Sequence, residues 1–408
     1  MPTPRLMTNY PGGFANGLSV RGMPLLQSQP GSFYWVSNSR TIPPGAVGGS
    51  DGNPGTFTKP FSTLAGALLQ CQQGAGDIIF IKPGHREAIS NATATALNVS
   101  GTAVIGLGSG NRRPTLVFDT AATANIPVRA CGIALQNLLL IANFADVASL
   151  FTAATVATGT TSTITAAASA AGGVPTFTAV AIGAGTFYPG MSLSGTGVLP
   201  GTIILRQLTG TTGGIGTYEV SLNQTVASTT ISGITPDFAI ENCEIRDTTS
   251  VLNALTVFTA SGTANACDGF YFCNNRVKSL GTTAATTAIK TTVGQDRWKI
   301  CGNFGVSAVL NDTAAMLAAG AGQLTALEIA YNVWERPSTS TTGGNMVSGS
   351  GNAWTGMAYD NRFTNADATS GIWIATGHGT AFGLNENYDL FGTTITDRSG
   401  VLSPVAAT

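Results

Sequence analysis

The sequence predicts an all-β protein that folds as a right-handed parallel β-helix, and three observations lead to this prediction. Ten-residue segments in the C-terminal part recur at intervals of 26 to 32 residues. Short apolar runs separated by Gly, Asn, Thr and Ser fill most of the chain, a pattern typical of all-β proteins. Only one segment has the apolar spacing of an amphipathic helix. We therefore expect stacked β coils with a short N-terminal capping helix and an inserted small β-sandwich or barrel domain.

The composition excludes several classes of protein. Of the 408 residues, 43% are hydrophobic and 10% are charged, and the net charge is −1. Disordered chains combine low hydrophobicity with high net charge, and general nucleic-acid binders need an excess of basic residues. A membrane span needs about 20 consecutive apolar residues, and the best stretch, 132–151, is broken by Gln136, Asn137, Asn143 and Asp146. The shortage of charge indicates that other subunits cover part of the surface.

Residues 1–40 are predicted to form an extended N-terminal arm. Turn signals occur at positions 10–13 and 29–31, and the apolar residues between and after them have no helical period. Such a segment cannot bury its own apolar side chains, so we expect it to lie on a body or on a neighbour. The predicted partner-binding residues are Tyr10, Phe14, Leu25, Leu26, Phe33 and Trp35.

Residues 41–151 are predicted to begin the β-helix with its capping helix. Apolar residues at positions 64, 67, 68 and 71 follow the spacing of one helical face. Ser62 is the predicted N-cap, and Gly74 ends the helix. The apolar run Ile78–Ile81 follows as a buried strand.

The strongest pattern lies in residues 237–395, before a C-terminal tail at 396–408. A strand with one apolar face is unstable alone, but copies stacked at ~4.8 Å bury a continuous core. A corner Asn tolerates left-handed backbone and can bond to the Asn of the next coil. The right hand follows from the preference of parallel crossovers. The alternative, a leucine-rich repeat, lacks the Leu-rich consensus. The sixth residues of the repeated segments are Cys243, Asn275, Asn303, Asn332, Asn361 and Asn387.

Residues 152–236 interrupt this pattern. Ala/Thr/Gly-rich flanks enclose several short strand-like runs bounded by turn residues. We expect a compact inserted β-domain on one corner of the tube.

Two segments resemble known proteins. Thr58-Lys59-Pro60-Phe61-Ser62-Thr63-Leu64, followed by Gly76-Asp77-Ile78-Ile79-Phe80-Ile81-Lys82-Pro83-Gly84, resembles the opening of pectate-lyase-like right-handed β-helix proteins. With Asn9-Tyr10-Pro11-Gly12-Gly13-Phe14 it also resembles structural proteins of tailed bacteriophages, and the insert is similar to a small β-domain of phage virion proteins. The resemblance implies a capping helix before the first strand and a role in a virion.

Few residues are candidates for chemistry. Asp360 and Glu386 occupy the same position in successive segments and would stand about 5 Å apart. Such carboxylates can act as acid and base on a glycosidic bond, although two solvated corner residues are the favoured interpretation. Trp354 is the candidate for stacking on a glycan.

Other polar residues are predicted to be structural. His85 and His378 lie in turns and are expected on the surface. The six cysteines contain no CxxC pair, so we predict reduced thiols, no metal and no cofactor. The alignment of Glu328 with Lys299 and of Glu244 with Arg276 predicts ion pairs between coils.

These observations lead to a functional hypothesis and one alternative. We expect a non-enzymatic virion protein of a tailed phage, a decoration or cement protein that binds the outer capsid surface and stabilises the head. The expected partners are the major capsid protein and copies of this chain in a homotrimer, with no nucleic acid and no membrane, after assembly in the host cytoplasm. The alternative is a tailspike or tail-fibre protein that binds host surface glycan, and can cleave it, through Asp360, Glu386 and Trp354.

Overall fold

The computed structural model describes most of the chain between Leu18 and Asp389. The described residues are 18–20, 23–25, 31–42, 44–90, 95–144, 147–153, 157–170, 172–248, 255–262, 265, 267–279, 287–307, 314–319, 324–336, 345–349, 355–365, 381–382 and 386–389. Within them, no helix is long and apolar enough to cross a membrane.

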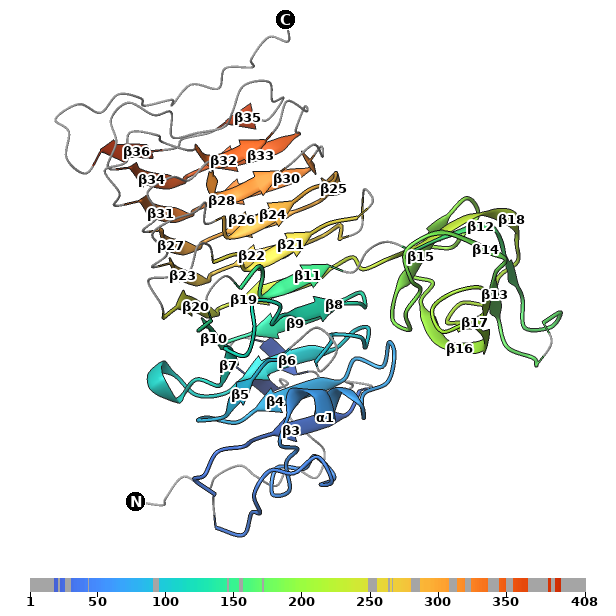
Figure 1. The fold of residues 1–408 in the computed structure, drawn as a ribbon, viewed down its shortest axis with the longest axis horizontal. Coiled ribbons are helices and arrows are strands. Elements are labelled where there is room, and N and C mark those ends of the chain that lie inside the picture. The colour runs from blue at the N-terminus through green and yellow to red at the C-terminus, as the bar shows by residue number, and fades with distance from the viewer. Residues whose placement is uncertain are drawn as a thin grey trace, which may run out of the picture.

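The main body is a parallel β-helix, which confirms the predicted fold class (Figure 1). Successive coils add strands to three sheets, so the strands of a sheet follow one another in chain order. Sheet 1 contains β3 (Phe33–Val36), β4 (Ile78–Ile81), β6 (Ala103–Gly106), β9 (Ile133–Gln136), β19 (Phe238–Glu241), β22 (Tyr271–Cys273), β26 (Lys299–Cys301), β30 (Leu327–Ala330), β33 (Gly356–Tyr359) and β35 (Ala381–Phe382).

The next two sheets complete the wall of the tube. Sheet 2 contains β5 (Arg86–Ala88), β7 (Thr115–Phe118), β10 (Leu139–Ala142), β20 (Glu244–Asp247), β23 (Arg276–Ser279), β27 (Phe304–Ser307), β31 (Val333–Arg336), β34 (Arg362–Asn365) and β36 (Glu386–Asp389). Sheet 3 contains β8 (Ile126–Val128), β11 (Phe151–Ala153), β21 (Phe258–Ala260), β24 (Ile289–Thr291), β28 (Ala314–Ala319) and β32 (Asn345–Gly349). Short strands β25 (Gln295–Asp296) and β29 (Leu324–Thr325) pair beside sheet 1.

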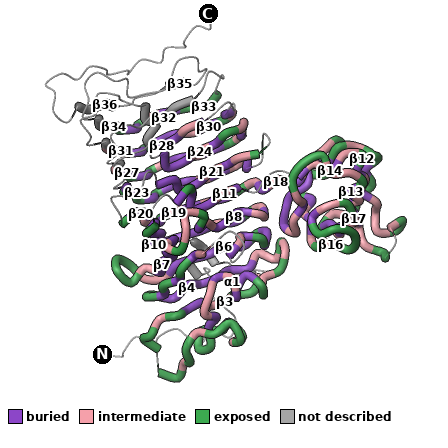
Figure 2. Tube along the Cα trace, viewed as in Figure 1, coloured by how far each residue is buried: buried purple, intermediate pink, exposed green. Residues whose placement is uncertain are grey.

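The alternating residues of these strands fill the interior of the tube (Figure 2). Phe258 and Phe270 stack with ring centroids 4.2 Å apart, and Trp298 meets Phe270 edge-on at 5.1 Å. Trp298 and Trp334 are each 1% exposed. Large aromatic side chains bury the most apolar surface per residue, so this column holds successive coils together.

A ladder of buried Asn side chains marks the corner between sheets 1 and 2, as predicted. The backbone N–H of Asn303 donates to Oδ1 of Asn332 at 3.1 Å, and that of Asn332 donates to Oδ1 of Asn361 at 3.0 Å. The side-chain amide of each ladder residue donates to a main-chain carbonyl of the preceding coil, as Asn332 does to Ile300 at 2.9 Å.

The left-handed residue of this corner is one position earlier than the sequence predicts. Asn274, Tyr331 and Asp360 have φ of 58°, 57° and 50°, and each directly precedes a ladder Asn. In this two-residue turn, the first residue adopts the left-handed conformation that changes the chain direction, and the second supplies the buried amide.

The last described coil corrects the predicted alignment. Glu386 pairs with Arg362, and Ala381 pairs with Met357. The sequence alignment placed Glu386 opposite Asp360 and is therefore out of register by two residues. In the observed register Asn387 pairs with Phe363 and not with Asn361.

The N-terminal end differs from the predicted arm. Phe33–Val36 forms β3, which pairs in parallel with β4 and is the first strand of sheet 1, so the tube begins before residue 40. Ahead of it, β1 (Leu18–Val20) and β2 (Met23–Leu25) form an antiparallel hairpin. Trp35 packs against Phe57 and Phe80, with ring centroids 4.9 Å apart in both cases. Main-chain pairing inside a sheet, which apolar spacing alone does not reveal, fixes this segment.

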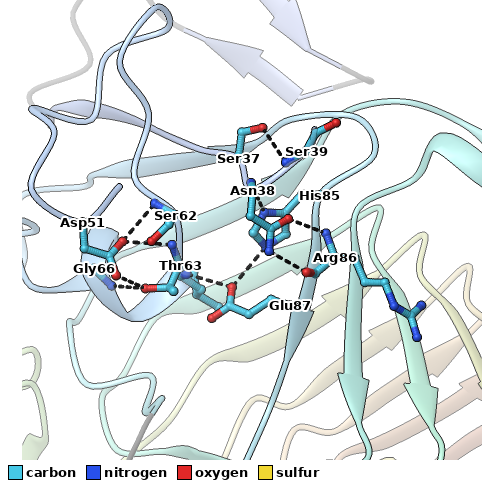
Figure 3. A network of polar contacts seen from close by, with 11 residues as sticks. Ser37, Asn38, Ser39, Asp51, Ser62, Thr63, Gly66, His85, Arg86 and Glu87 are labelled. Carbon is cyan, nitrogen blue, oxygen red and sulfur yellow. Dashed lines mark hydrogen bonds and ion pairs between the residues drawn. The ribbon is translucent and has the colours of Figure 1, made fainter. Parts of the chain in front are cut away.

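The capping helix α1 (Leu64–Leu68) is held at its N-terminus by two carboxylates (Figure 3). The N-cap is Thr63 and not Ser62, since the Thr63 side chain accepts a hydrogen bond from the Gly66 N–H at 3.0 Å. Asp51 accepts the N–H groups of Ser62 and Thr63 at 2.9 and 3.0 Å. Oε2 of Glu87 accepts the Leu64 N–H at 2.9 Å.

His85 belongs to the same network, so its prediction as a surface residue is wrong. It is 1% exposed. Its Nδ1 accepts the Asn38 N–H at 3.0 Å, which leaves the proton on Nε2 to donate to Glu87 at 3.1 Å. The chain that follows β3 covers the ring.

Acid should weaken this cap through Asp51. Burial alone would raise the pKa of Asp51, but the hydrogen bonds from Ser62 and Thr63 outweigh it and hold the pKa below its ordinary value of 3.8. A depressed carboxyl pKa adds stability above pH 3.8 that is lost as pH falls through the folded-state pKa. We expect Asp51→Asn to lower the melting temperature at pH 6, and the gap to close below pH 3.8. A gap that stays constant from pH 6 to pH 2.5 contradicts this.

The insert forms a separate β-domain that stands beside the tube (Figure 1). Its strands are β12 (Ala157–Thr165), β13 (Thr176–Ala179), β14 (Ala181–Ala184), β15 (Ser192–Gly195), β16 (Ile204–Gly210), β17 (Gly216–Val220) and β18 (Val226–Ile234). A bridge between Ser192 and Ile203 links the outer strands of the sheet. The Cys131 N–H donates to the Gly190 carbonyl at 3.0 Å, and Arg129 covers the Tyr188 ring at 4.6 Å. The insert therefore contacts the tube near the corner where sheet 3 leads to sheet 1.

A disulfide joins two neighbouring coils, which corrects the prediction that all thiols are reduced. Cys273 and Cys301 are register partners in β22 and β26 and are bonded to each other. Cys71, Cys131, Cys243 and Cys267 are free. Burial raises the pKa of Cys71 to about 12 and that of Cys131 to about 11, so these thiols stay protonated at neutral pH.

Loss of this disulfide should destabilise the tube. Its ends are 28 residues apart, and closing such a loop restricts the unfolded chain by about 3 kcal/mol. We expect the variant with Cys273→Ala and Cys301→Ala to show this decrease in denaturant unfolding. Reductant should weaken the native chain and leave the double variant unchanged; equal responses of the two proteins would contradict the crosslink.

Candidate functional site

The predicted site residues do not come together in the described structure. Asp360 is an exposed left-handed corner residue, and Glu386 lies in β36 opposite Arg362. Leu25 lies in β2, and Phe33 and Trp35 lie in β3. Tyr10, Phe14, Leu26 and Trp354 are outside the described residues.

A polar groove lies instead along the corner between sheets 1 and 2. It has a volume of about 500 Å³ and is lined by Arg113, Gln136, Asn137, Asn242, Cys243, Asn274 and Arg276. A neighbouring hollow of about 470 Å³ on sheet 2 is lined by Glu244, Ile245, Arg276, Val277, Lys278, Phe304 and Val306. Because Arg276 lines both, they form one surface, which we call the arginine groove.

The local sequence explains why these side chains face outward. In β23, Val277 and Ser279 are buried while Arg276 and Lys278 are exposed, as strand alternation requires. Phe304 takes the outward position in β27 and is 44% exposed. Asn242 and Asn274 are exposed because they are the left-handed residues of the corner turn.

The ion pairs of the groove are loose. Glu244 lies 3.6 Å from Nη1 of Arg113 and 3.6 Å from Nη1 of Arg246, so the expected pairing of Glu244 with Arg276 is not among the ion pairs of the described residues. Strong charge-assisted hydrogen bonds are about 2.7–2.9 Å long. The Nε atoms of Arg113 and Arg246 are buried without a hydrogen-bond partner among the described residues.

A second group of side chains, which we call the tyrosine cluster, lies further along the same corner. Tyr331 is 59% exposed, and its ring meets that of Tyr359 edge-on at 5.4 Å. Tyr359 donates its hydroxyl to Glu328 at 2.8 Å, and Lys299 pairs with Glu328 at 3.0 Å. This confirms the ion pair predicted for Glu328 and Lys299. Met357, 55% exposed, is also on this face.

The charges of the tyrosine cluster depend on one another. Burial alone would raise the pKa of Glu328, but hydrogen bonds from Lys299 and Tyr359 lower it below its ordinary value. The hydrogen bond to Glu328 raises the pKa of Tyr359 to about 12. At neutral pH the cluster therefore presents a neutral phenol beside a carboxylate and an ammonium group. Among the described residues, no group of three or more His, Cys, Asp or Glu is placed to hold a metal ion.

Comparisons with known proteins find similar solved structures but no matching family. No protein-family model matches the chain, and no curated protein matches it. A solved rhamnogalacturonan lyase shares 12% identity at a TM-score of 0.34, with 87% of each chain covered. The pectate lyase Pel9A shares 13% identity at a TM-score of 0.32, covering 87% of this chain and 75% of that one. The tailspike of Pseudomonas phage phi297 shares 8% identity at a TM-score of 0.19, covering 76% and 71%.

These likenesses concern the fold alone. The prediction that the chain is not an enzyme is nevertheless corrected, because two of the structures named above are lyases. That prediction was drawn from the absence of an obvious active site in the sequence, and such an absence does not exclude activity. The chain is a parallel β-helix by its own sheet order, and lyases and a phage tailspike are among the solved structures to which it is similar.

Proposed function

We propose that the chain binds a carbohydrate polymer along the corner between sheets 1 and 2, as a tailspike or tail-fibre protein of a tailed phage. One observation carries the proposal: hydrogen-bonding side chains and exposed aromatic rings share this corner. The arginine groove supplies guanidinium and amide groups, and Phe304 and Tyr331 supply rings.

This combination suits a sugar chain. A sugar ring presents hydroxyl groups at its edge and C–H groups on its faces, so it needs both polar partners and flat apolar partners. Aromatic side chains offer large rigid surfaces with a preferred geometry. Successive corners are ~4.8 Å apart, so the corner residues from Asn242 to Asp360 extend over roughly 19 Å, room for several sugar units.

The head-decoration hypothesis receives no such support. One of its reasons was the apolar arm, and two of the predicted arm residues, Phe33 and Trp35, belong to the first strand of sheet 1. Binding to the major capsid protein, a place in the virion and a homotrimer remain predictions. Analytical ultracentrifugation of the full chain measures the last of these.

Polymer binding is tested with ring-deletion variants. Wild-type protein, Phe304→Ala and Tyr331→Ala are compared on an array of bacterial surface polysaccharides and by affinity electrophoresis. Loss of one stacking ring should weaken binding about three- to tenfold. Phe144→Ala is the matched control, since Phe144 is 37% exposed and follows the other end of a sheet 2 strand.

Two results would overturn the proposal. One is wild-type protein that binds no polysaccharide on the array. The other is binding that Phe144→Ala weakens as much as Phe304→Ala and Tyr331→Ala do.

A further inference from the structure

We infer that the bound polymer is anionic and that Arg113 and Arg276 hold its carboxylate or sulfate groups in the arginine groove. The inference rests on the proposed function and names the chemical class of its ligand. It depends on how the cationic groups of the groove are placed and on how few partners they have.

Positive charge is concentrated here in a chain of net charge −1. Arg113, Arg246, Arg276 and Lys278 lie on or beside the groove. Glu244 is shared between Arg113 and Arg246 at 3.6 Å from each. Arg276 and Lys278 are exposed, and they are in none of the ion pairs formed by the described residues. The acidic groups therefore do not neutralise the groove.

Glu241 is the second acidic residue near the groove. It accepts a hydrogen bond from the Gln136 amide at 2.6 Å. It is in none of the ion pairs formed by the described residues, so it does not hold Arg276. Gln136, in turn, is held in place at the wall of the groove.

Arg113 lines the groove with a loosely paired guanidinium group. Its Nε is buried without a partner among the described residues, so its terminal N–H groups are the ones that face a ligand, and their ion pair with Glu244 spans 3.6 Å. Guanidinium groups bind carboxylate and sulfate oxygens through pairs of N–H donors. An anionic group at the groove would accept hydrogen bonds from the terminal N–H groups of Arg113 and from the exposed Arg276.

A nucleic acid is the less favoured polyanion. Nucleic-acid sites combine a basic domain with extended basic patches, whereas the net charge of this chain is −1. The amide lining of Asn242, Asn274 and Gln136 suits sugar hydroxyls.

The test compares charged and neutral forms of the same polymers. Affinity electrophoresis uses polygalacturonate, its carboxyl-reduced derivative, dextran sulfate, dextran and a single-stranded thymidine oligonucleotide. Each acidic glycan that binds in the array is added together with its carboxyl-reduced or desulfated form. We expect the acidic form to bind at least about tenfold more tightly than its neutral form, since a hydrogen bond to a charged group contributes that much. Binding of polygalacturonate indicates a carboxylate ligand, and binding of dextran sulfate indicates a sulfate ligand.

Variants assign the effect to the groove. Arg276→Gln should weaken binding of the acidic polymer about tenfold. Arg276→Lys should weaken it less, because lysine keeps the positive charge but lacks the paired N–H donors of the guanidinium group. Arg113→Gln should behave like Arg276→Gln, with thermal melting used to confirm its fold. Arg206→Gln is the matched control, since Arg206 is 68% exposed on the insert and pairs with Glu219.

The outcomes separate the two proposals. Equal binding of acidic and neutral forms, or preference for the oligonucleotide, overturns this inference. The proposed carbohydrate binding is then judged by the polysaccharide array alone. Acidic binding that Arg276→Gln does not reduce also overturns it. Absence of binding to every polysaccharide overturns both.

Discussion

Replacing Asn332 by leucine is expected to lower the free energy of unfolding by about 5 kcal/mol. Its Oδ1 accepts the backbone N–H and the side-chain amide of Asn303, at 3.1 and 2.9 Å. Its own amide donates to the carbonyl of Ile300 and to Asn361, both at 2.9 Å. Asn332 is 0% exposed, so leucine leaves several buried groups unpaired at about 1–3 kcal/mol each.

Denaturant unfolding followed by circular dichroism measures this loss. Asn111→Ala is the matched control, because Asn111 is exposed and lies in the short helix η1 (Gly110–Arg112). Exposed substitutions of this kind change stability by less than about 0.5 kcal/mol. A loss below about 1 kcal/mol for Asn332→Leu would show that the ladder contributes little to stability.

Replacing Gly305 by valine is expected to cost about 4 kcal/mol, by a different mechanism. Gly305 pairs with Trp334 of the next coil, and a Cβ at Gly305 would stand 2.2 Å from the indole ring. Trp334 is 1% exposed and cannot move aside without displacing the core. Overpacking of this kind is among the few causes of large single-site effects.

A double-mutant cycle tests whether the clash is with Trp334. Trp334→Ala alone should cost about 3–5 kcal/mol because it leaves a cavity. Combined with Gly305→Val, the loss should be smaller than the two single losses added, because valine fills part of that cavity. Additive losses would show that Gly305→Val acts through another contact.

The fold was predictable because its physical cause repeats along the chain. Each coil needs inward apolar residues and a corner amide, so these residue types recur at similar intervals in the sequence and the repeats can be aligned. Gly305 breaks the apolar pattern in the sequence, and only the structure shows that Trp334 of the next coil fills its place. The sequence of one coil does not show that a side chain of the next coil fills the space beside its glycine.

The predictions were wrong at residues whose position depends on contacts that do not repeat from coil to coil. Phe33–Val36 joins sheet 1 through hydrogen bonds with β4, a partner that lies 45 residues away, as Phe33 and Ile78 show. His85 is buried because the chain after β3 folds over it. Cys273 and Cys301 have ordinary spacing in the sequence and meet only through the register of their strands.

The candidate site was harder to predict than the fold. The search paired Asp360 with Glu386 through an alignment that was two residues out of register. The groove draws Arg113 from one coil and Arg276 from another, and the sequence marks neither as functional. Strand alternation predicts the outward position of Arg276 in β23, but Arg113 lies outside the strands, and its loose ion pair with Glu244 is visible only in the structure.

The Asn ladder also gives the tube a direction. Each ladder side chain reaches back to the coil before it: Asn332 to Ile300 and Asn361 to Ile329. The backbone N–H of each ladder Asn points the other way and needs an acceptor from the next coil, as that of Asn303 donates to Oδ1 of Asn332. Because a ribosome delivers the earlier coil first, the growing end of the nascent protein always carries one unsatisfied corner, which the next stretch of polypeptide closes.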